Sequence, residues 1–153
     1  MDTLTPAQRS QRMARVRGKN TSPEMAVRRL THALGYRFRL HRKDLPGRPD
    51  LVFPRHRAVI LVHGCFWHRH PDPVCPLARL PKSRLSFWLP KLERNRARDL
   101  ENREALARGG WRVLELWECE LKNRTETAER VRSFLSGEDR NCAQSNCSPA
   151  PAA

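Results

Sequence analysis

A stretch of 14 residues, from Val62 to Cys75, constrains the fold of this chain more than any other segment. It holds two cysteines, three histidines, an adjacent Phe–Trp pair and the two prolines Pro71 and Pro73. Proline fixes its own backbone and removes a hydrogen-bond donor, so we expect an irregular loop here. Cysteine and histidine are preferred ligands of Zn²⁺, and a bound ion can fix such a loop. The segment therefore predicts a metal-stabilised loop attached to a folded core.

The chain is long enough for one compact domain, because its 153 residues include 39% hydrophobic side chains. We expect this domain over residues 1–135, with a basic helix or arm over 1–20. Residues 136–153 turn to Gly, Ser, Asn, Pro and Ala, which predicts a disordered tail. The apolar runs are too short to span a bilayer, and the N-terminus lacks the apolar core of a secretory signal. These features predict a cytoplasmic protein with no membrane partner.

Positive charge is concentrated in the first third of the chain. Residues 1–57 hold 14 Lys and Arg against four Asp and Glu, a balance of +10, and the remainder contributes the other +4 of the net +14. An Arg-rich coding bias explains why Arg outnumbers Lys 25 to 5, but it does not explain the shortage of acids in this segment. A basic segment on a folded domain is typical of a protein that binds a phosphate backbone. We therefore expect a nucleic acid partner.

Hydrophobic periodicity and capping residues predict an α/β fold. Thr5-Pro6-Ala7-Gln8 forms a capping box before the first helix, and Gly35 is placed to end the second. The side chains expected to face inward on the long helix are Leu92, Leu100 and Leu106. The expected order is helices over about 5–16 and 22–34, strands over 36–40, 51–53 and 58–62, a helix over about 90–108, a strand over 111–117 and a helix over 126–135. This order predicts a mixed central sheet flanked by helices.

One carboxylate and two imidazoles are the candidate catalytic groups. Asp50 follows the rigid Pro49 at the start of a buried strand, where a carboxylate can bind Mg²⁺ together with an oxygen ligand from the next strand. Taken alone, a loop-capping role is the better interpretation of this aspartate. His63 and His68 lie at and just beyond the end of the neighbouring strand, where either can take a proton from the attacking water or give one to the leaving 3′ oxygen. Glu24 suits the N-terminus of its helix on electrostatic grounds, so spacing assigns it no catalytic role.

The cysteines form a candidate zinc site rather than disulfides, because the cytosol keeps thiols reduced. A Cys₃His set, a usual composition of a closed structural zinc site, is available in Cys65, His70, Cys75 and Cys119. The distant Cys119 would attach the loop to the core, although Cys65 and Cys119 also suit small buried apolar positions. Cys142 and Cys147 lie in the expected tail, and we assign them no metal role.

Three aromatic residues are candidates for contact with nucleic-acid bases. Phe66 and Trp67 are adjacent, so in an extended segment their rings would point to opposite sides and one would be exposed. Trp88 is the third candidate, whereas we expect Trp111 and Trp117 in the core. Exposed rings beside a basic surface can stack on bases or wedge between them.

Several strings of residues, in the same order along the chain, resemble the very short patch repair (Vsr) endonucleases over roughly residues 8–135. The matching strings are Arg12–Thr21, Leu45–Asp50, His63–His68, Phe87–Trp88, Gly110–Leu114 and Trp117–Cys119. The resemblance implies a restriction-endonuclease-like fold with histidines in place of that fold's usual active-site lysine. It also implies Mg²⁺-dependent nicking of one DNA strand 5′ to the thymine of a T·G mismatch, which arises when 5-methylcytosine deaminates.

The resemblance also implies roles for single residues. Asp50 and the Val62 backbone carbonyl would bind Mg²⁺. His68 would act as general base, with His63 and Glu24 as supporting groups. The structural zinc ligands would be Cys65, His70, Cys75 and Cys119, and the side chains that enter the duplex would be Phe66, Trp67, Trp88, Met13 and Val16.

The chain departs from the family pattern in two places. Val62 stands where a well-known member has Thr, and a backbone carbonyl ligand tolerates this change. Four residues separate His70 from Cys75, a longer interval than in the family. Cys75 nevertheless keeps the family distance to Cys119, so it is still the expected ligand.

Together these observations predict a monomeric, mismatch-directed DNA endonuclease of the bacterial cytoplasm, associated with the nucleoid when it binds DNA. Other mismatch-repair proteins are candidate partners. Lys91 and Asn95, one turn apart on the long helix, are candidate base contacts, as are several arginines. Two alternatives stay open: a restriction- or homing-type nuclease on the same fold that cuts matched DNA, and a zinc-stabilised DNA-binding module without catalysis.

Overall fold

The computed structural model describes residues 5–14, 21–72 and 74–137 of the chain. The main elements follow the expected order: α1 (Pro6–Ala14), α2 (Ser22–Ala33), β1 (Arg39–Leu40), β2 (Leu51–Phe53), β3 (Ala58–His63), α3 (Leu85–Arg108), β4 (Arg112–Trp117) and α4 (Arg124–Ser136). None of the helices formed by these residues is long and apolar enough to cross a membrane. Outside the described part lie the side chain of Met13, all of Val16, the tail beyond Gly137, and with it Cys142 and Cys147.

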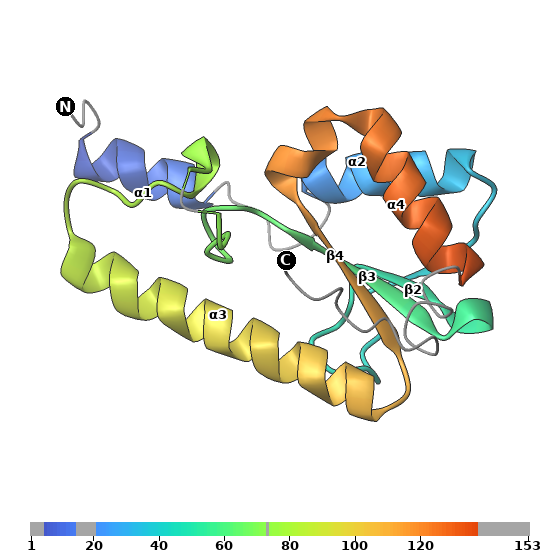
Figure 1. The fold of residues 1–153 in the computed structure, drawn as a ribbon. Helices are drawn as coiled ribbons and strands as arrows, with labels where there is room; N and C mark the ends of the chain where they lie inside the picture. Colours follow the sequence, from blue (N-terminus) through green and yellow to red (C-terminus); the bar gives the residue numbers. More distant parts are fainter. Residues whose placement is uncertain (1–4, 15–20, 73, 138–153) are drawn as a thin grey trace, which may run out of the picture.

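The strands of the described residues form one mixed sheet in the order β1-β2-β3-β4. β1, β2 and β3 pair antiparallel, and Leu40 lies opposite Leu51. β3 and β4 pair parallel, so that His63 and Trp117 lie side by side at the ends of both strands. A parallel pair needs a long crossover connection, which α3 provides. The helices α2 and α4 lie on one side of the sheet and α3 on the other (Figure 1), which confirms the predicted mixed sheet flanked by helices.

Each face of the sheet has its own core, because successive side chains of a strand point to opposite faces. The larger core, on the side of α2 and α4, consists of Val27, Leu51, Phe53, Ala58, Ile60, Val62, Leu116, Val131, Phe134 and Leu135. The smaller core, on the side of α3, consists of Val52, Val59 and Leu106. β2 and β3 are therefore buried on both faces, which explains their uninterrupted apolar sequences.

Capping groups define the helix ends, and the capping box at Thr5 and the stop at Gly35 agree with the prediction. The Thr5 hydroxyl accepts the Gln8 N–H at 3.2 Å, and the Gln8 side chain accepts the Thr5 N–H at 2.9 Å, which completes the capping box of α1. Thr21 caps α2 by accepting the Glu24 N–H. Gly35 follows α2 with φ +94°, a left-handed conformation that glycine adopts readily. Glu24 is thereby fixed on the first turn of α2.

The predicted start of the long helix near Pro90 is wrong. α3 begins at Leu85, so Pro90 lies inside it and removes one backbone hydrogen bond. The extra turn carries Phe87 and Trp88, whose rings pack against each other with centroids 5.2 Å apart. Trp88 also contacts the rings of Phe66 and Trp67 in the loop after β3, and this packing supports the turn despite the proline.

The expectation that Leu100 faces inward is also wrong, since this side chain is 46% exposed. Leu92 and Leu106 are fully buried, as predicted. At about 100° per residue, Leu100 lies roughly 80° around the helix from Leu92 and roughly 120° from Leu106. It therefore falls outside the buried stripe of α3.

The expected strand over 36–40 and the two core tryptophans need correction as well. Only Arg39–Leu40 pairs as β1, while the preceding residues Tyr36 and Phe38 pack against the larger core. Trp111 and Trp117 are half-buried rather than sealed in the core. Both rings make polar contacts, since guanidinium groups lie over Trp111 and imidazoles lie against Trp117.

The two leucines of α3 give a matched test of this packing. Leu106→Ala should lower the free energy of unfolding by about 2–5 kcal/mol, because it leaves a cavity in the smaller core. Leu100→Ala, on the exposed side of the same helix, should change it by less than about 0.5 kcal/mol. Urea unfolding followed by circular dichroism measures both, and equal losses would contradict the assigned helix face.

Candidate active site and cysteine–histidine cluster

A cleft of about 990 Å³ opens where the start of β2 and the end of β3 meet the first turn of α2 and the C-terminal half of α3. The structure places the four predicted catalytic residues on its wall: Glu24, Asp50, His63 and His68. Among the further titratable residues of the lining are His41 and Asp99, which the sequence interpretation did not single out. The lining therefore combines carboxylates and imidazoles from every layer of the fold.

The Asp50 carboxylate is held where β2 and β3 separate. Its Oδ2 accepts the Val62 N–H at 2.7 Å. In an extended strand the N–H and C=O of one residue point to the same side, so the Val62 carbonyl faces the same edge. Gly47, with φ +72°, lets the preceding turn approach α3, because a Cβ at this position would come within 2.7 Å of the Asn102 side chain. The turn and the amide together fix the carboxylate at the cleft.

The surroundings raise the pKa of Asp50 from 3.8 to about 7. Burial is the largest cause, because it disfavours the charged carboxylate, and the negative charge of nearby Glu24 adds to it. The Val62 N–H and His68 act in the opposite direction. Two neighbouring acids in a buried position are an arrangement that a bound cation would relieve.

His41 is the first site residue that the sequence interpretation missed. Its Nε2 lies 3.4 Å from Glu24 Oε2 and 3.8 Å from Asp50 Oδ1. The antiparallel pairing of Leu40 with Leu51 places the next residue, His41, opposite Asp50. Only this strand register could have indicated that His41 belongs to the site, and the register depends on a strand of two residues.

His63 and His68 lie against each other, with ring centroids 4.5 Å apart. His68 Nδ1 lies 2.5 Å from Asp99 Oδ2, so a carboxylate of α3 orients this ring. His63 Nε2 lies 3.7 Å from Glu115 Oε1, and Arg103 donates to the same oxygen at 3.1 Å. The pKa of Glu115 is lower than its usual value. The contact with His63 is the main cause, and Arg103 contributes as well. Asp99 was missed because it is one of many charged residues on α3, and only the docking of the helix selects it.

The three predicted wedge residues form one aromatic cluster with Phe87. Ring centroids lie 5.1 Å apart for Phe66 and Trp67, 5.5 Å for Phe66 and Trp88, and 5.9 Å for Trp67 and Trp88. Phe66, Trp67 and Trp88 are half-buried, and Phe87 is 49% exposed. None of the four belongs to either core of the sheet. This aromatic cluster is therefore a surface feature beside the cleft.

The two candidate base contacts on α3 lie against this aromatic cluster. Lys91 Nζ lies 5.6 Å from the Trp67 ring centroid and 5.7 Å from that of Trp88, a cation–π arrangement. Asn95 donates from Nδ2 to the Trp67 carbonyl oxygen at 3.2 Å. In the DNA-free structure both residues therefore hold the loop and its rings in place.

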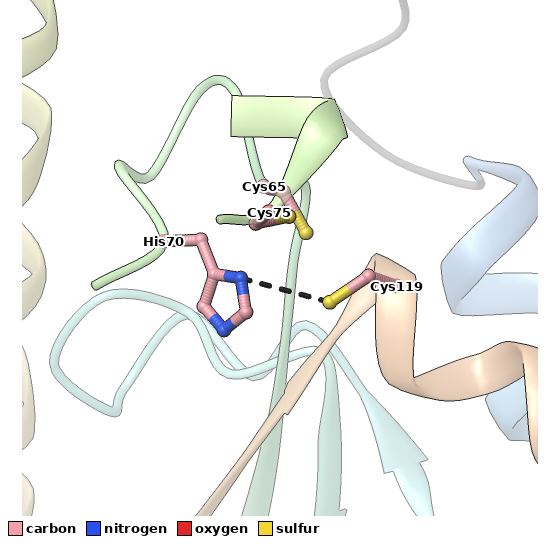
Figure 2. Close-up of side chains that lie close together, drawn as sticks. All are labelled: Cys65, His70, Cys75 and Cys119. Atoms are coloured by element: carbon pink, nitrogen blue, oxygen red, sulfur yellow. Dashed lines mark hydrogen bonds between the residues drawn. The ribbon is translucent and has the colours of Figure 1, made fainter. Parts of the chain in front are cut away.

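The four predicted zinc ligands also gather, with one ligand atom of each lying within 4.8 Å of the others. Their side chains come from the loop and from the turn after β4 and point toward a common centre (Figure 2). Cys119 Sγ and His70 Nδ1 lie 3.6 Å apart. Cys65 and Cys75 are buried. This set is the cysteine–histidine cluster.

The thiols of the cysteine–histidine cluster differ in acidity. Burial raises the pKa of Cys65 to about 12 and also raises the pKa of Cys119. A hydrogen bond with His70 lowers the pKa of Cys75 to about 7. Trp117 connects this cluster to the cleft, because its ring stacks on His70 with centroids 4.5 Å apart and lies 4.8 Å from the ring of His63.

Comparison with known proteins identifies the family. The family model described as DNA mismatch endonuclease Vsr matches residues 1–72. Over 134 residues the chain is 56% identical to the type II nicking enzyme V.XorIIP of Xanthomonas oryzae pv. oryzae, covering 88% of this chain and 96% of the relative. This chain belongs to the Vsr family.

Two further relatives support membership of this family. The DNA mismatch endonuclease Vsr of Escherichia coli K12 is 39% identical over 142 residues, covering 90% of this chain and 89% of the relative. The type II nicking enzyme V.NmeAIP of Neisseria meningitidis is 38% identical over 134 residues, covering 88% of this chain and 94% of the relative. Membership of the Vsr family confirms the resemblance and makes the chain a nuclease, which argues against the DNA-binding module without catalysis.

The raised pKa of Asp50 predicts a pH-dependent effect on stability. Between pH 4 and 7 the folded state keeps a proton on Asp50 that the unfolded state has lost, so this residue destabilises the fold increasingly as pH rises. In a buffer without added divalent cations, Asp50→Asn should therefore raise the free energy of unfolding at pH 8, by on the order of 1–3 kcal/mol. The gain should shrink toward pH 4.

Urea unfolding at pH 4.5 and pH 8 measures this difference. The asparagine keeps an oxygen that can accept the Val62 N–H, so the hydrogen bond is not removed with the charge. Asp44→Asn is the matched control, because the side chain of Asp44 is 61% exposed and pairs only with Arg42 among the described groups. A gain at pH 8 that persists undiminished at pH 4.5 would contradict the titration of Asp50.

Proposed function

We propose that this Vsr-family enzyme nicks one strand of double-stranded DNA 5′ to the thymine of T·G mismatches, in a reaction that depends on Mg²⁺. Such mismatches arise by deamination of 5-methylcytosine. The observation that carries the proposal is the convergence of Asp50 and Glu24 with His63 and His68 on one cleft, which Trp67 of the aromatic cluster also lines.

The donor atoms at the cleft suit a hard divalent cation. The proposed ligands are the Asp50 carboxylate and the Val62 backbone carbonyl, with Glu24 alongside. Mg²⁺ prefers such oxygen ligands and keeps several waters. When bound, it would supply the positive charge that stabilises the developing charge on the scissile phosphate. Burial and, after it, the nearby Glu24 raise the pKa of Asp50, and a carboxylate in such surroundings supports a cation at this point.

His68 is suited to take the proton of the attacking water. Its Nδ1 is engaged by Asp99, which leaves Nε2 as the proton acceptor and fixes the ring orientation. His63 lies against His68 and would assist by giving a proton to the leaving 3′ oxygen. Asp99 is thus a positioning residue that acts through His68.

We assign mismatch selection to the aromatic cluster. A T·G wobble pair is weaker than a normal pair, so unstacking the step beside it costs less than elsewhere. Inserting side chains costs on the order of a few kcal/mol per step, and added contact surface offsets this cost. The enzyme can therefore select mismatches through the deformability of the duplex. Met13 and Val16 of the N-terminal segment are proposed to enter from the other groove, and Lys91 and Asn95 to reach base edges once DNA displaces their present partners.

The cysteine–histidine cluster is proposed to hold a structural Zn²⁺. Three thiols and one imidazole with ligand atoms this close suit a closed tetrahedral site. The ion would anchor the loop that carries Phe66, Trp67 and His68 to the end of β4 through Cys119. Its proposed contribution is to folding and positioning, not to the chemical step.

The proposal also covers the oligomeric state, the cellular location and the partners of the enzyme. We propose that the enzyme works as a monomer on nucleoid DNA in the bacterial cytoplasm and that other mismatch-repair proteins are partners. The charge supports DNA as partner, since the chain carries a net +14. The alternative is a nuclease on the same fold that cuts matched DNA on both strands.

Nicking of defined duplexes tests this function. In Mg²⁺ the purified protein should nick the thymine strand of a T·G duplex and leave the matched T·A duplex intact, as measured with end-labelled strands on a denaturing gel. Asp50→Ala should lower the rate by about 10³-fold, because a cation at this point is worth several kcal/mol. DNA binding should be retained, and Asp44→Ala should nick normally. Equal cutting of both duplexes would refute mismatch selection and favour the alternative.

Zinc content tests the cysteine–histidine cluster. The purified protein should contain about one zinc per chain, and Cys119→Ser should lower this content and destabilise the fold by on the order of several kcal/mol. Cys142→Ser, a change to a cysteine outside the proposed ligand set, should leave both unchanged. The measurements are atomic absorption and thermal unfolding. A Cys119→Ser protein with full zinc content would rule out the proposed ligand set.

A further inference from the structure

The carboxylates of Glu24 and Asp50 enclose a third group, the imidazole of His41. One ligand atom of each lies within 4.8 Å of the others, and all three residues line the cleft. We propose that His41 is a nitrogen ligand of the catalytic cation and that it makes this site bind Mn²⁺ more tightly than Mg²⁺. The proposal rests on the cation site proposed above at Asp50 and extends its ligand set.

The backbone directs His41 to this point. The register of β1 on β2 places it opposite Asp50, and its φ of +45° turns the chain sharply at the end of β1. A left-handed conformation is costly for a residue with a Cβ, so the surrounding structure must hold it. The ring is three-quarters buried, with a side-chain exposure of 24%. Its Nε2 is fully buried and makes no hydrogen bond to any residue that the structure describes.

The missing hydrogen bond distinguishes a ligand from an ion pair. A protonated imidazole between two carboxylates should form a short charge-assisted bond of about 2.7–2.9 Å. His41 Nε2 instead lies 3.4 Å from Glu24 and 3.8 Å from Asp50, and Arg28 donates to the same Glu24 oxygen at 3.2 Å. An imidazole nitrogen that faces two carboxylates at these distances without a hydrogen bond to either is the arrangement expected of a ligand beside an ion.

The ligand chemistry sets the metal preference. Mg²⁺ is satisfied by oxygen atoms and gains little from a nitrogen ligand. Mn²⁺ accepts carboxylates equally well and stands within the transition-metal series, whose members bind imidazole nitrogen. Two carboxylates and one imidazole therefore favour Mn²⁺, whereas the carboxylates and the Val62 carbonyl alone would suit Mg²⁺.

The test uses Mn²⁺ itself as the probe, bound to the full-length, zinc-loaded protein without DNA. Electron spin echo envelope modulation of bound Mn²⁺ should show coupling to a directly bonded ¹⁴N nucleus. Free Mn²⁺, counted by its aqueous electron paramagnetic resonance signal, gives the affinity, and competition gives the affinity for Mg²⁺. Wild-type protein should bind Mn²⁺ at least about tenfold more tightly than Mg²⁺.

Two matched variants locate the nitrogen, since His63, His68 and Asp99 form a second group that could hold an ion. His41→Gln should abolish the ¹⁴N coupling, weaken Mn²⁺ binding by about tenfold or more and change Mg²⁺ affinity far less. His68→Gln should keep the coupling. Circular dichroism checks that each variant is folded, and the wild-type spectrum carries the test if a variant is not.

Other outcomes of the same measurements would overturn the assignment of His41 as a metal ligand. If His41 only neutralises the two acids as an imidazolium ion, its removal should leave Mn²⁺ affinity unchanged or increase it. That result, a wild-type spectrum without ¹⁴N coupling, or coupling lost only in His68→Gln would overturn the proposal. Nicking of T·G DNA in Mg²⁺ by the wild-type enzyme is measured separately, so a failure of the proposed function is distinguished from a failure of this ligand assignment.

Discussion

The hydrogen bond from the Val62 amide to the Asp50 carboxylate is the constraint on which the site depends. β2 and β3 are buried on both faces, and their pairing fixes how far each strand extends. Where the strands separate, the side chain of Asp50 takes up a backbone donor at the edge of the sheet. This contact holds a carboxylate in a position whose burial disfavours its charge. The cost of that position is a reason to expect a cation there.

A second anchor lies on the other side of the loop. The cysteine–histidine cluster ties the loop to the turn after β4, and Trp117 lies between its His70 and the active-site His63. The loop between these anchors carries Phe66, Trp67 and His68. Parallel pairing of β3 with β4 brings His63 and Trp117 to the same level, so one sheet register aligns both sites. The aromatic cluster and His68, the proposed general base, are therefore positioned by the same two supports.

Much of this arrangement could be predicted because its signals are local. The order of elements follows from periodicity and capping, and the ends of short apolar strands point to Asp50 and to His63 with His68. The spacing of cysteine and histidine in one proline-broken loop points to three residues of the cysteine–histidine cluster, Cys65, His70 and Cys75. Each of these inferences needs only a few neighbouring residues, whereas Cys119 is a distant residue that completes a usual Cys₃His composition.

The two site residues that the sequence interpretation did not identify are positioned by contacts between distant segments. His41 enters the site through the register of a two-residue strand, and Asp99 through the docking of α3, and neither leaves a pattern in its own segment. Pro90 suggested a helix start, but packing of Trp88 on the loop outweighs the lost hydrogen bond. Leu100 looked inward because leucine is apolar, whereas its angle on the helix places it in solvent.

We propose that the carboxylates and imidazoles of one cleft act on a single phosphate while the aromatic rings open the neighbouring base step. A crystal structure of the Asp50→Asn enzyme bound to a T·G duplex tests it most directly. The phosphate 5′ to the mismatched thymine should lie within hydrogen-bonding distance of His68, with the rings of Phe66 and Trp67 between base pairs. A duplex that lies away from the cleft, or that stays fully stacked with the rings folded on the protein, would contradict it.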